Sequence, residues 1–84
     1  NLKLNFVSGT LYASQLSQLW TEVTYDGKTE YWKLHPSMLT TDGKSIVMIF
    51  SDTFAGKTLR IRFYAFDLYG KQTQFTNYID IYVR

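Results

Sequence analysis

The sequence contains no cysteine, one proline and one histidine. Without cysteine the fold has no disulfide, and a zinc site would have to use His35 and carboxylates alone, which is uncommon. The longest purely apolar run, Ile46 to Phe50, is far too short to span a membrane, so we expect no membrane insertion. The formal net charge of +2 is too small to imply nucleic-acid binding through the field of the whole chain.

Signals for catalysis are missing as well. Asp26, Asp42 and Asp67 each lie in an expected turn, where aspartate caps backbone amides. The triplet Gly56-Lys57-Thr58 lacks the earlier glycine of a phosphate-binding loop, and a strand pattern follows it instead of a helix. We therefore predict no enzyme activity, no cofactor and no metal site.

The clearest positive signal is the alternation of residues from Lys57 to Phe66. Apolar residues occupy one parity (Leu59, Ile61, Phe63 and Ala65), and Arg60, Arg62 and Tyr64 occupy the other. A period of two is typical of a strand with one buried face and one solvated face. This segment is expected to seal the core with its apolar side.

Similar patterns predict further strands, separated by turn residues. We expect them over residues 2–6, 19–25, 29–34, 45–50 and 78–83, and we interpret residues 10–18 as a loop or a short strand. Asp26-Gly27 predicts a tight hairpin, and the apolar segment 45–50 predicts a strand buried on both faces or at the centre of a sandwich. About six or seven strands without a long helix indicate an all-β fold, an antiparallel sandwich or a small barrel. One of Trp20 and Trp32 is expected to fill the core, and the other to be exposed.

The last two expected strands define a candidate contact face. If they pair antiparallel with residue numbers summing to 142, Arg62 lies opposite Asp80, and apolar residues meet apolar residues on the other face. This pairing has two interpretations, an ordinary solvated face held by cross-strand pairs or a platform that binds a partner. The candidate contact residues are Arg60, Arg62, Tyr64, Tyr78, Tyr82 and Trp32.

The second half of the chain resembles the closing strands of bacterial immunoglobulin-like domains. The resemblance rests on the segment L-R-I-R-F-Y-A-F-D-L-Y-G-K, residues 59–71, and on I-D-I-Y-V, residues 79–83, and it covers about residues 44–84. It implies an antiparallel immunoglobulin-like or fibronectin type III-like β-sandwich, with Asp67 capping the turn and Gly70 at positive φ. The chain lacks the Cys…Trp…Cys framework of antibody domains.

Two functions follow as expectations. The first is a non-catalytic spacer or docking module, residues 1–84, cut from a longer bacterial protein that is secreted, on the cell surface or associated with the cell envelope. Its partners would be neighbouring domains or another protein. The alternative is a carbohydrate-binding module that uses exposed Trp and Tyr rings. The aromatic content of 18% is high enough to supply such rings in addition to those in the core.

Overall fold

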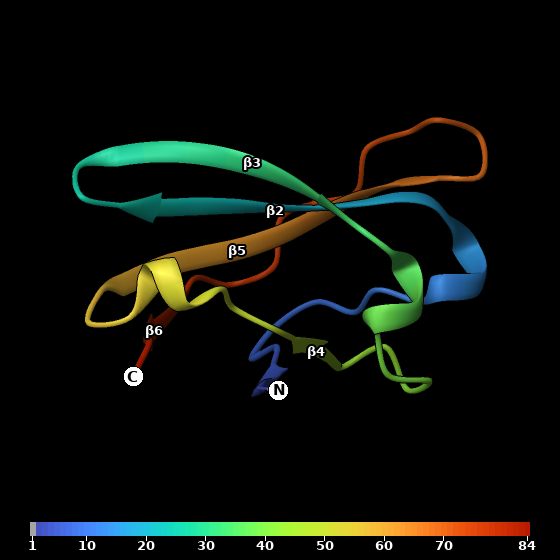
Figure 1. Cartoon of the computed structure of the whole chain (residues 1–84). Coiled ribbons are helices and arrows are strands. Elements are labelled where there is room, and N and C mark those ends of the chain that lie inside the picture. The colour runs from blue at the N-terminus through green and yellow to red at the C-terminus, as the bar shows by residue number, and fades with distance from the viewer. Residues whose placement is uncertain (1) are drawn as a thin grey trace.

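The computed structural model describes residues 2–84 and shows an all-β chain in two antiparallel sheets (Figure 1). The strands are β1 (Leu2–Asn5), β2 (Leu16–Tyr25), β3 (Lys28–Leu34), β4 (Ser45–Met48), β5 (Thr58–Asp67) and β6 (Ile79–Tyr82). Single 3₁₀ turns lie at Ala13–Gln15, Pro36–Met38 and Asp52–Phe54. No helix among the described residues has the length and apolar character needed to cross a membrane.

The larger sheet has the strand order β3-β2-β5-β6, and the smaller one consists of β1 and β4. The long strands β2 and β5 pair at the centre of the larger sheet, with Leu19 opposite Ala65 and Val23 opposite Ile61. β1 and β4 lie as short strands on one side of this sheet (Figure 1). We call the surface turned toward β1 and β4 the inner face, and the opposite surface the outer face.

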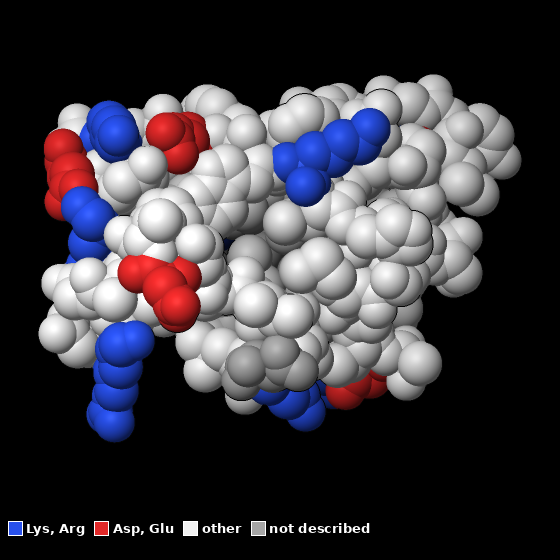
Figure 2. Space-filling view, in the orientation of Figure 1, with Lys and Arg blue, Asp and Glu red and all other residues white. Residues whose placement is uncertain are grey.

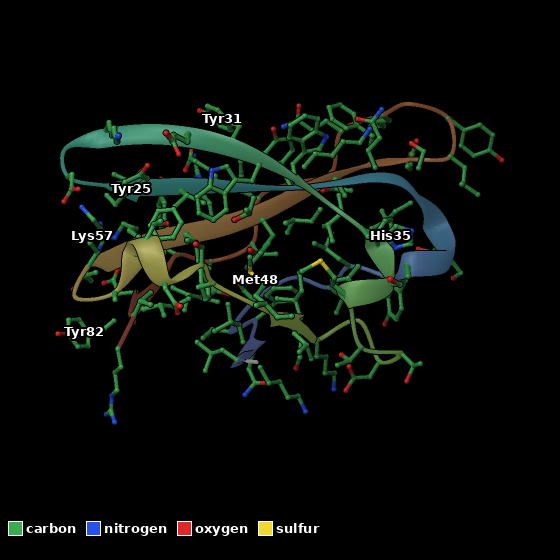
Figure 3. The ribbon with its side chains drawn as sticks, viewed as in Figure 1. Tyr25, Tyr31, His35, Met48, Lys57 and Tyr82 are labelled. Carbon is green, nitrogen blue, oxygen red and sulfur yellow. The ribbon has the colours of Figure 1, made fainter. Side chains whose placement is uncertain are left out.

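The core lies between the two sheets. The alternate apolar side chains of β5 are completely buried, as the alternation predicted. They pack with residues of β1, β2 and β4 in a hydrophobic cluster. Figure 3 shows Met48 of β4 directed between the layers. The ring centroids of Phe6 and Phe63 lie 5.5 Å apart, which connects the end of β1 to β5. Burial of this cluster is the main favourable contribution to folding.

The hairpin of β2 and β3 forms as predicted. Tyr25 pairs with Lys28, so that Asp26 and Gly27 alone make the loop. Both loop residues have positive φ, 49° and 74°, as the two-residue turn that suits the twist of a hairpin requires.

The prediction that segment 45–50 is buried on both faces is wrong. β4 ends at Met48, and the side chains of Val47 and Ile49 are exposed. Only one side of the two-stranded sheet meets the core, so alternate residues of β4 face solvent. An apolar run in the sequence does not reveal by itself that one face of the resulting strand is exposed to solvent.

The two tryptophans divide between the faces, and each is half-buried. Trp32 lies opposite Thr21 on the inner face and packs against Phe54, with ring centroids 5.3 Å apart. Trp20 lies on the outer face, where it pairs with Tyr64. The expectation of one core and one exposed tryptophan is therefore correct in that the two lie on opposite faces, and wrong in that neither is fully buried or fully exposed. Trp32, which we expected on the contact face, is the one that packs against the core.

Candidate contact face of the four-stranded sheet

All four strands of the larger sheet, together with the loop before β6, place aromatic or charged residues on the outer face. We call these residues the outer aromatic face: Trp20, Glu22, Tyr31, Arg60, Arg62, Tyr64, Phe66, Phe75, Tyr78, Asp80 and Tyr82. Their arrangement follows from the register, which aligns the outward residues of neighbouring strands. In Figure 3, Tyr31 projects from β3 on the side away from Met48.

An ion pair between β2 and β5 lies at the centre of this face. Arg62 Nε donates to Glu22 Oε2 at 2.7 Å, and Arg62 Nη2 donates to Glu22 Oε1 at 3.3 Å. Tyr31 Oη also donates to Glu22 Oε1, at 3.3 Å. Glu22 is only 8% exposed, so its charge depends on these donors. The hydrogen bond to Glu22 raises the pKa of Arg62 above its ordinary value.

The same guanidinium packs against two aromatic rings. Arg62 Cζ lies 3.8 Å from the ring centroid of Phe75 and 4.6 Å from that of Tyr78. A cation at this distance from a ring is attracted by the ring quadrupole. Arg62 is therefore fixed both by the carboxylate and by the rings from the segment that leads into β6.

Tyr64 is the aromatic centre of the face. Its ring centroid lies 5.0 Å from Phe75, 6.1 Å from Phe66, and 6.4 Å from both Trp20 and Tyr31. The Trp20 ring is nearly parallel to it at 10°, whereas the Tyr31 ring meets it edge-on at 77°. Burial raises the pKa of Tyr64, and the charges of Tyr31 and Glu22 add to the shift.

A second ion pair continues the face toward its edge. Arg60 Nε donates to Asp80 Oδ1 at 3.0 Å, and its guanidinium lies 5.3 Å from the centroid of Tyr78. Both charged side chains are exposed, so solvent screens their attraction. The hydrogen bond to Asp80 raises the pKa of Arg60.

Five of the six predicted contact residues lie together on this face, and Trp32 does not. It projects from the inner face of β3, where its Nε1 donates to Glu30 Oε1 at 3.2 Å. Arg60, Arg62, Tyr64, Tyr78 and Tyr82 share the outer face.

The predicted register between β5 and β6 is wrong by two residues. Asp80 lies opposite Arg60, and Arg62 instead pairs across β2 with Glu22. The shift arises because Thr73 and Thr76 occupy the edge of β5 before β6 begins. Their backbone amides donate to Ala65 O and Phe63 O, and their hydroxyls accept from the amides of the same two residues.

Sequence reasoning missed Glu22 and Tyr31 as parts of this face. The signal was present, because a two-residue loop at Asp26-Gly27 fixes Glu22 opposite Tyr31. Phe75 could not be found in the same way, since it lies in an irregular segment with no period.

Other chemistry in the described chain is sparse. Residues 2–84 contain no group of three His, Cys, Asp or Glu side chains able to hold a metal ion. His35 Nδ1 accepts a hydrogen bond from the amide of Ser37 and caps a short 3₁₀ turn. Two hollows are lined by residues outside the outer aromatic face, one by Leu68 and Tyr69 and the other by Tyr12 and Leu39. Figure 2 shows positive and negative groups interspersed on the visible side, without a broad field of one sign.

These features define an all-β chain whose larger sheet carries an ordered face of aromatic rings and paired charges. Searches against protein-family models, curated proteins and solved structures found no match.

Proposed function

We propose that the chain is a non-catalytic interaction module that contacts a protein surface through its outer aromatic face. The partner is a neighbouring domain of the same protein or another protein. The observation that carries the proposal is the combination of fixed and exposed groups on one sheet face. Arg62 is held in place by Glu22, while Tyr31, Tyr78 and Tyr82 remain 55%, 49% and 62% exposed.

This combination suits protein recognition. Tyr, Trp and Arg are enriched among the residues that contribute most to binding at protein interfaces. Side chains that are already ordered lose less conformational entropy on binding. The ionisable groups at the centre of the face are paired with one another, Arg62 with Glu22 and Arg60 with Asp80, which supports a contact role over acid–base chemistry.

The ring orientations favour a protein partner over a carbohydrate. Trp20 is nearly parallel to Tyr64 at 10°, but Tyr31 meets Tyr64 at 77° and Phe75 meets it at 58°, so the rings of the face as a whole do not share one plane. The guanidinium of Arg62 also lies over the Phe75 ring at 3.8 Å and occupies the surface on which a sugar would stack.

Strand order supports an immunoglobulin-like assignment within the all-β class. In that sandwich, strands B and E are neighbours in one sheet, and the other has the order C′-C-F-G. Here β1 pairs with β4, and β3-β2-β5-β6 follow the second order. On this proposal β1 and β4 correspond to B and E. The resemblance of residues 59–83 to bacterial immunoglobulin-like domains points to a secreted, surface or envelope-associated protein.

Hydroxyl-radical footprinting tests the contact face. We expect Tyr31, Tyr78 and Tyr82 to react more slowly in the native protein, on cells or in culture medium, than in the isolated 84-residue chain. Tyr69 is 95% exposed and lies in the loop after β5, so it serves as the internal control. Equal reactivity of the three face tyrosines in both samples would refute the contact role. A glycan array that gave a specific, saturable signal abolished by Tyr31→Ala would favour the carbohydrate alternative.

A further inference from the structure

The carboxylates of the outer aromatic face are already compensated by arginines of the same face. Arg62 donates to both oxygens of Glu22, and Arg60 donates to both oxygens of Asp80, at 3.0 Å and 3.4 Å. Tyr31 adds a third donor to Glu22, which is only 8% exposed. Within residues 2–84, a cation brought by a partner would therefore find no uncompensated carboxylate on this face.

Two cations on the same side of the sheet keep unused hydrogen-bond donors. Lys33 lies opposite Trp20, which places its side chain on the outer side, and it is exposed. No ion pair within residues 2–84 includes its ammonium group. Arg60 uses Nε and Nη2 for Asp80, so its Nη1 is unused, and its side chain is 58% exposed. The strands of the larger sheet thus place three cations and two carboxylates on this side.

The register fixes the distance between Lys33 and Arg60. Arg60 lies opposite Thr24 of β2, and Lys33 lies opposite Trp20, four residues away on the same strand. β2 separates the two strands that carry the cations. At the usual rise and spacing of strands, the Cα atoms of the two cations are roughly 16 Å apart. Tyr31, which is 55% exposed, lies in the row between them.

We propose that the partner surface covering the outer aromatic face is acidic, with carboxylates that bind Lys33 and Arg60 and an apolar group between them that packs on Tyr31. The proposal rests on the proposed contact role of the face and adds the chemistry of its partner. A carboxylate is the acceptor that suits ammonium and guanidinium groups, and charge-assisted hydrogen bonds are stronger than neutral ones. Such complementarity also selects among partners, because a basic surface would be repelled.

A second copy of the same face does not fit this description. The carboxylates of each copy are compensated by its own arginines, so two copies would oppose cations without supplying acceptors. The partner is therefore a different surface, in the same protein or in another one.

Carbodiimide coupling in the native protein, on cells or in culture medium, tests the contact at Lys33. The reagent activates a carboxyl group, and a lysine amine in an ion pair with that group displaces the activating group to form an amide. We expect mass spectrometry to find Lys33 joined to an aspartate or glutamate from outside residues 1–84. Lys57, paired with Asp26 within the chain, is the positive control, and the exposed Lys71 should stay uncoupled.

Charge variants combined with the tyrosine footprint test the same contact without coupling. Lys33→Glu should raise the hydroxyl-radical reactivity of Tyr31 in the native protein to that of the isolated chain, because two carboxylates then face each other. Lys33→Arg keeps the charge and should retain the protection, although its guanidinium cannot be coupled. Lys71→Glu changes the net charge equally, in the loop after β5, and should behave like the wild type. The isolated Lys33→Glu chain should melt like the isolated wild type, since Lys33 has no ion pair to lose within residues 2–84.

The possible results distinguish an acidic partner from the contact role itself. If the three face tyrosines are unprotected in the wild type, the contact role fails, and the acidic partner fails with it. If they are protected and Lys33→Glu leaves that protection unchanged, the contact role stands and the acidic partner is wrong. A missing Lys33 amide beside a formed Lys57 amide has the same consequence.

Two further results would also overturn the acidic protein partner. Equal loss of protection in Lys33→Glu and Lys71→Glu would show that net charge, rather than a contact at Lys33, is responsible. Coupling of Lys33 to a uronic acid would identify an acidic glycan as the occupant.

Discussion

Arg62 and Glu22 face each other across the two central strands, 40 positions apart in the sequence, and share two hydrogen bonds. The carboxylate is nearly buried and the guanidinium is half-buried between rings. Most ion pairs on a protein surface contribute little, but this one is shielded from solvent by its aromatic neighbours. Its removal should therefore be measurable.

Glu22→Gln is expected to lower the free energy of unfolding by about 1–2 kcal/mol, because the variant leaves Arg62 with a weaker, uncharged acceptor. Urea denaturation followed by tryptophan fluorescence measures the loss. Asp80→Asn, which affects the exposed pair with Arg60, is the matched control and should change stability much less. Equal losses in the two variants would show that burial does not distinguish the pairs.

Ile61→Asp is expected to unfold the chain, or to lower its stability by more than about 4 kcal/mol, since the new charge would have no partner in the core. Ile61 is completely buried on β5. Thr58→Asp on the exposed parity of the same strand is the control, and circular dichroism melts compare the two. Arg62→Ala on the same strand would not serve as a control, because it would leave Glu22 buried without its cation.

Tyr64→Phe is expected to reduce the loss of stability at alkaline pH. Burial raises the pKa of Tyr64 above its ordinary value of 10.0, so folding favours the neutral phenol. This stabilisation is complete below about pH 10, where the unfolded phenol is also neutral, and is lost as pH rises through the higher pKa of the folded state. Urea unfolding at pH 9 and pH 11 measures the difference.

The wild-type chain should thus lose more stability between these two pH values than Tyr64→Phe. Tyr69→Phe, at the exposed tip of the loop after β5, should behave like the wild type. A pH dependence that Tyr64→Phe leaves unchanged would contradict the assignment.

Gly43→Ala is expected to destabilise the chain more than Gly27→Ala. Both glycines have similar positive φ, 71° and 74°, so the backbone penalty of about 1 kcal/mol is shared. A Cβ at position 43 would lie 2.8 Å from Tyr12 Cε1, whereas nothing lies within 4 Å of one at position 27. Thermal melts of both variants in a Tyr12→Ala background should become equal, because the clash is then absent.

The sequence was informative wherever a short-range rule fixed the geometry. The two-residue alternation of apolar and polar residues in β5 predicted its buried and exposed sides, and Asp26-Gly27 predicted the hairpin. Both patterns depend only on residues that are close in the sequence. The all-β class followed from the same patterns. An immunoglobulin-like arrangement stays a proposal.

The errors came from interactions between distant segments. Thr73 and Thr76 bond to β5 with both backbone and side chain, and nothing in the alternation of β6 encodes that competition. The prediction therefore aligned Asp80 with Arg62, two residues from its observed place. For the candidate face, the alternation within β5 and β6 correctly predicted which of their residues share the outer face. It could not reveal that Glu22 of β2 supplies the carboxylate that pairs with Arg62.

The pairing of β2 with β5 also bears on the order in which the chain folds. The β2–β3 hairpin pairs only seven residues on each side of its turn and can form within microseconds. Its contact with β5 must wait until a loop of some forty residues closes, and that closure costs chain entropy before any contact offsets it. We therefore expect the hairpin to be the first structured part of a nascent chain. The aromatic and charged groups of the outer face would assemble only in the last, rate-limiting step.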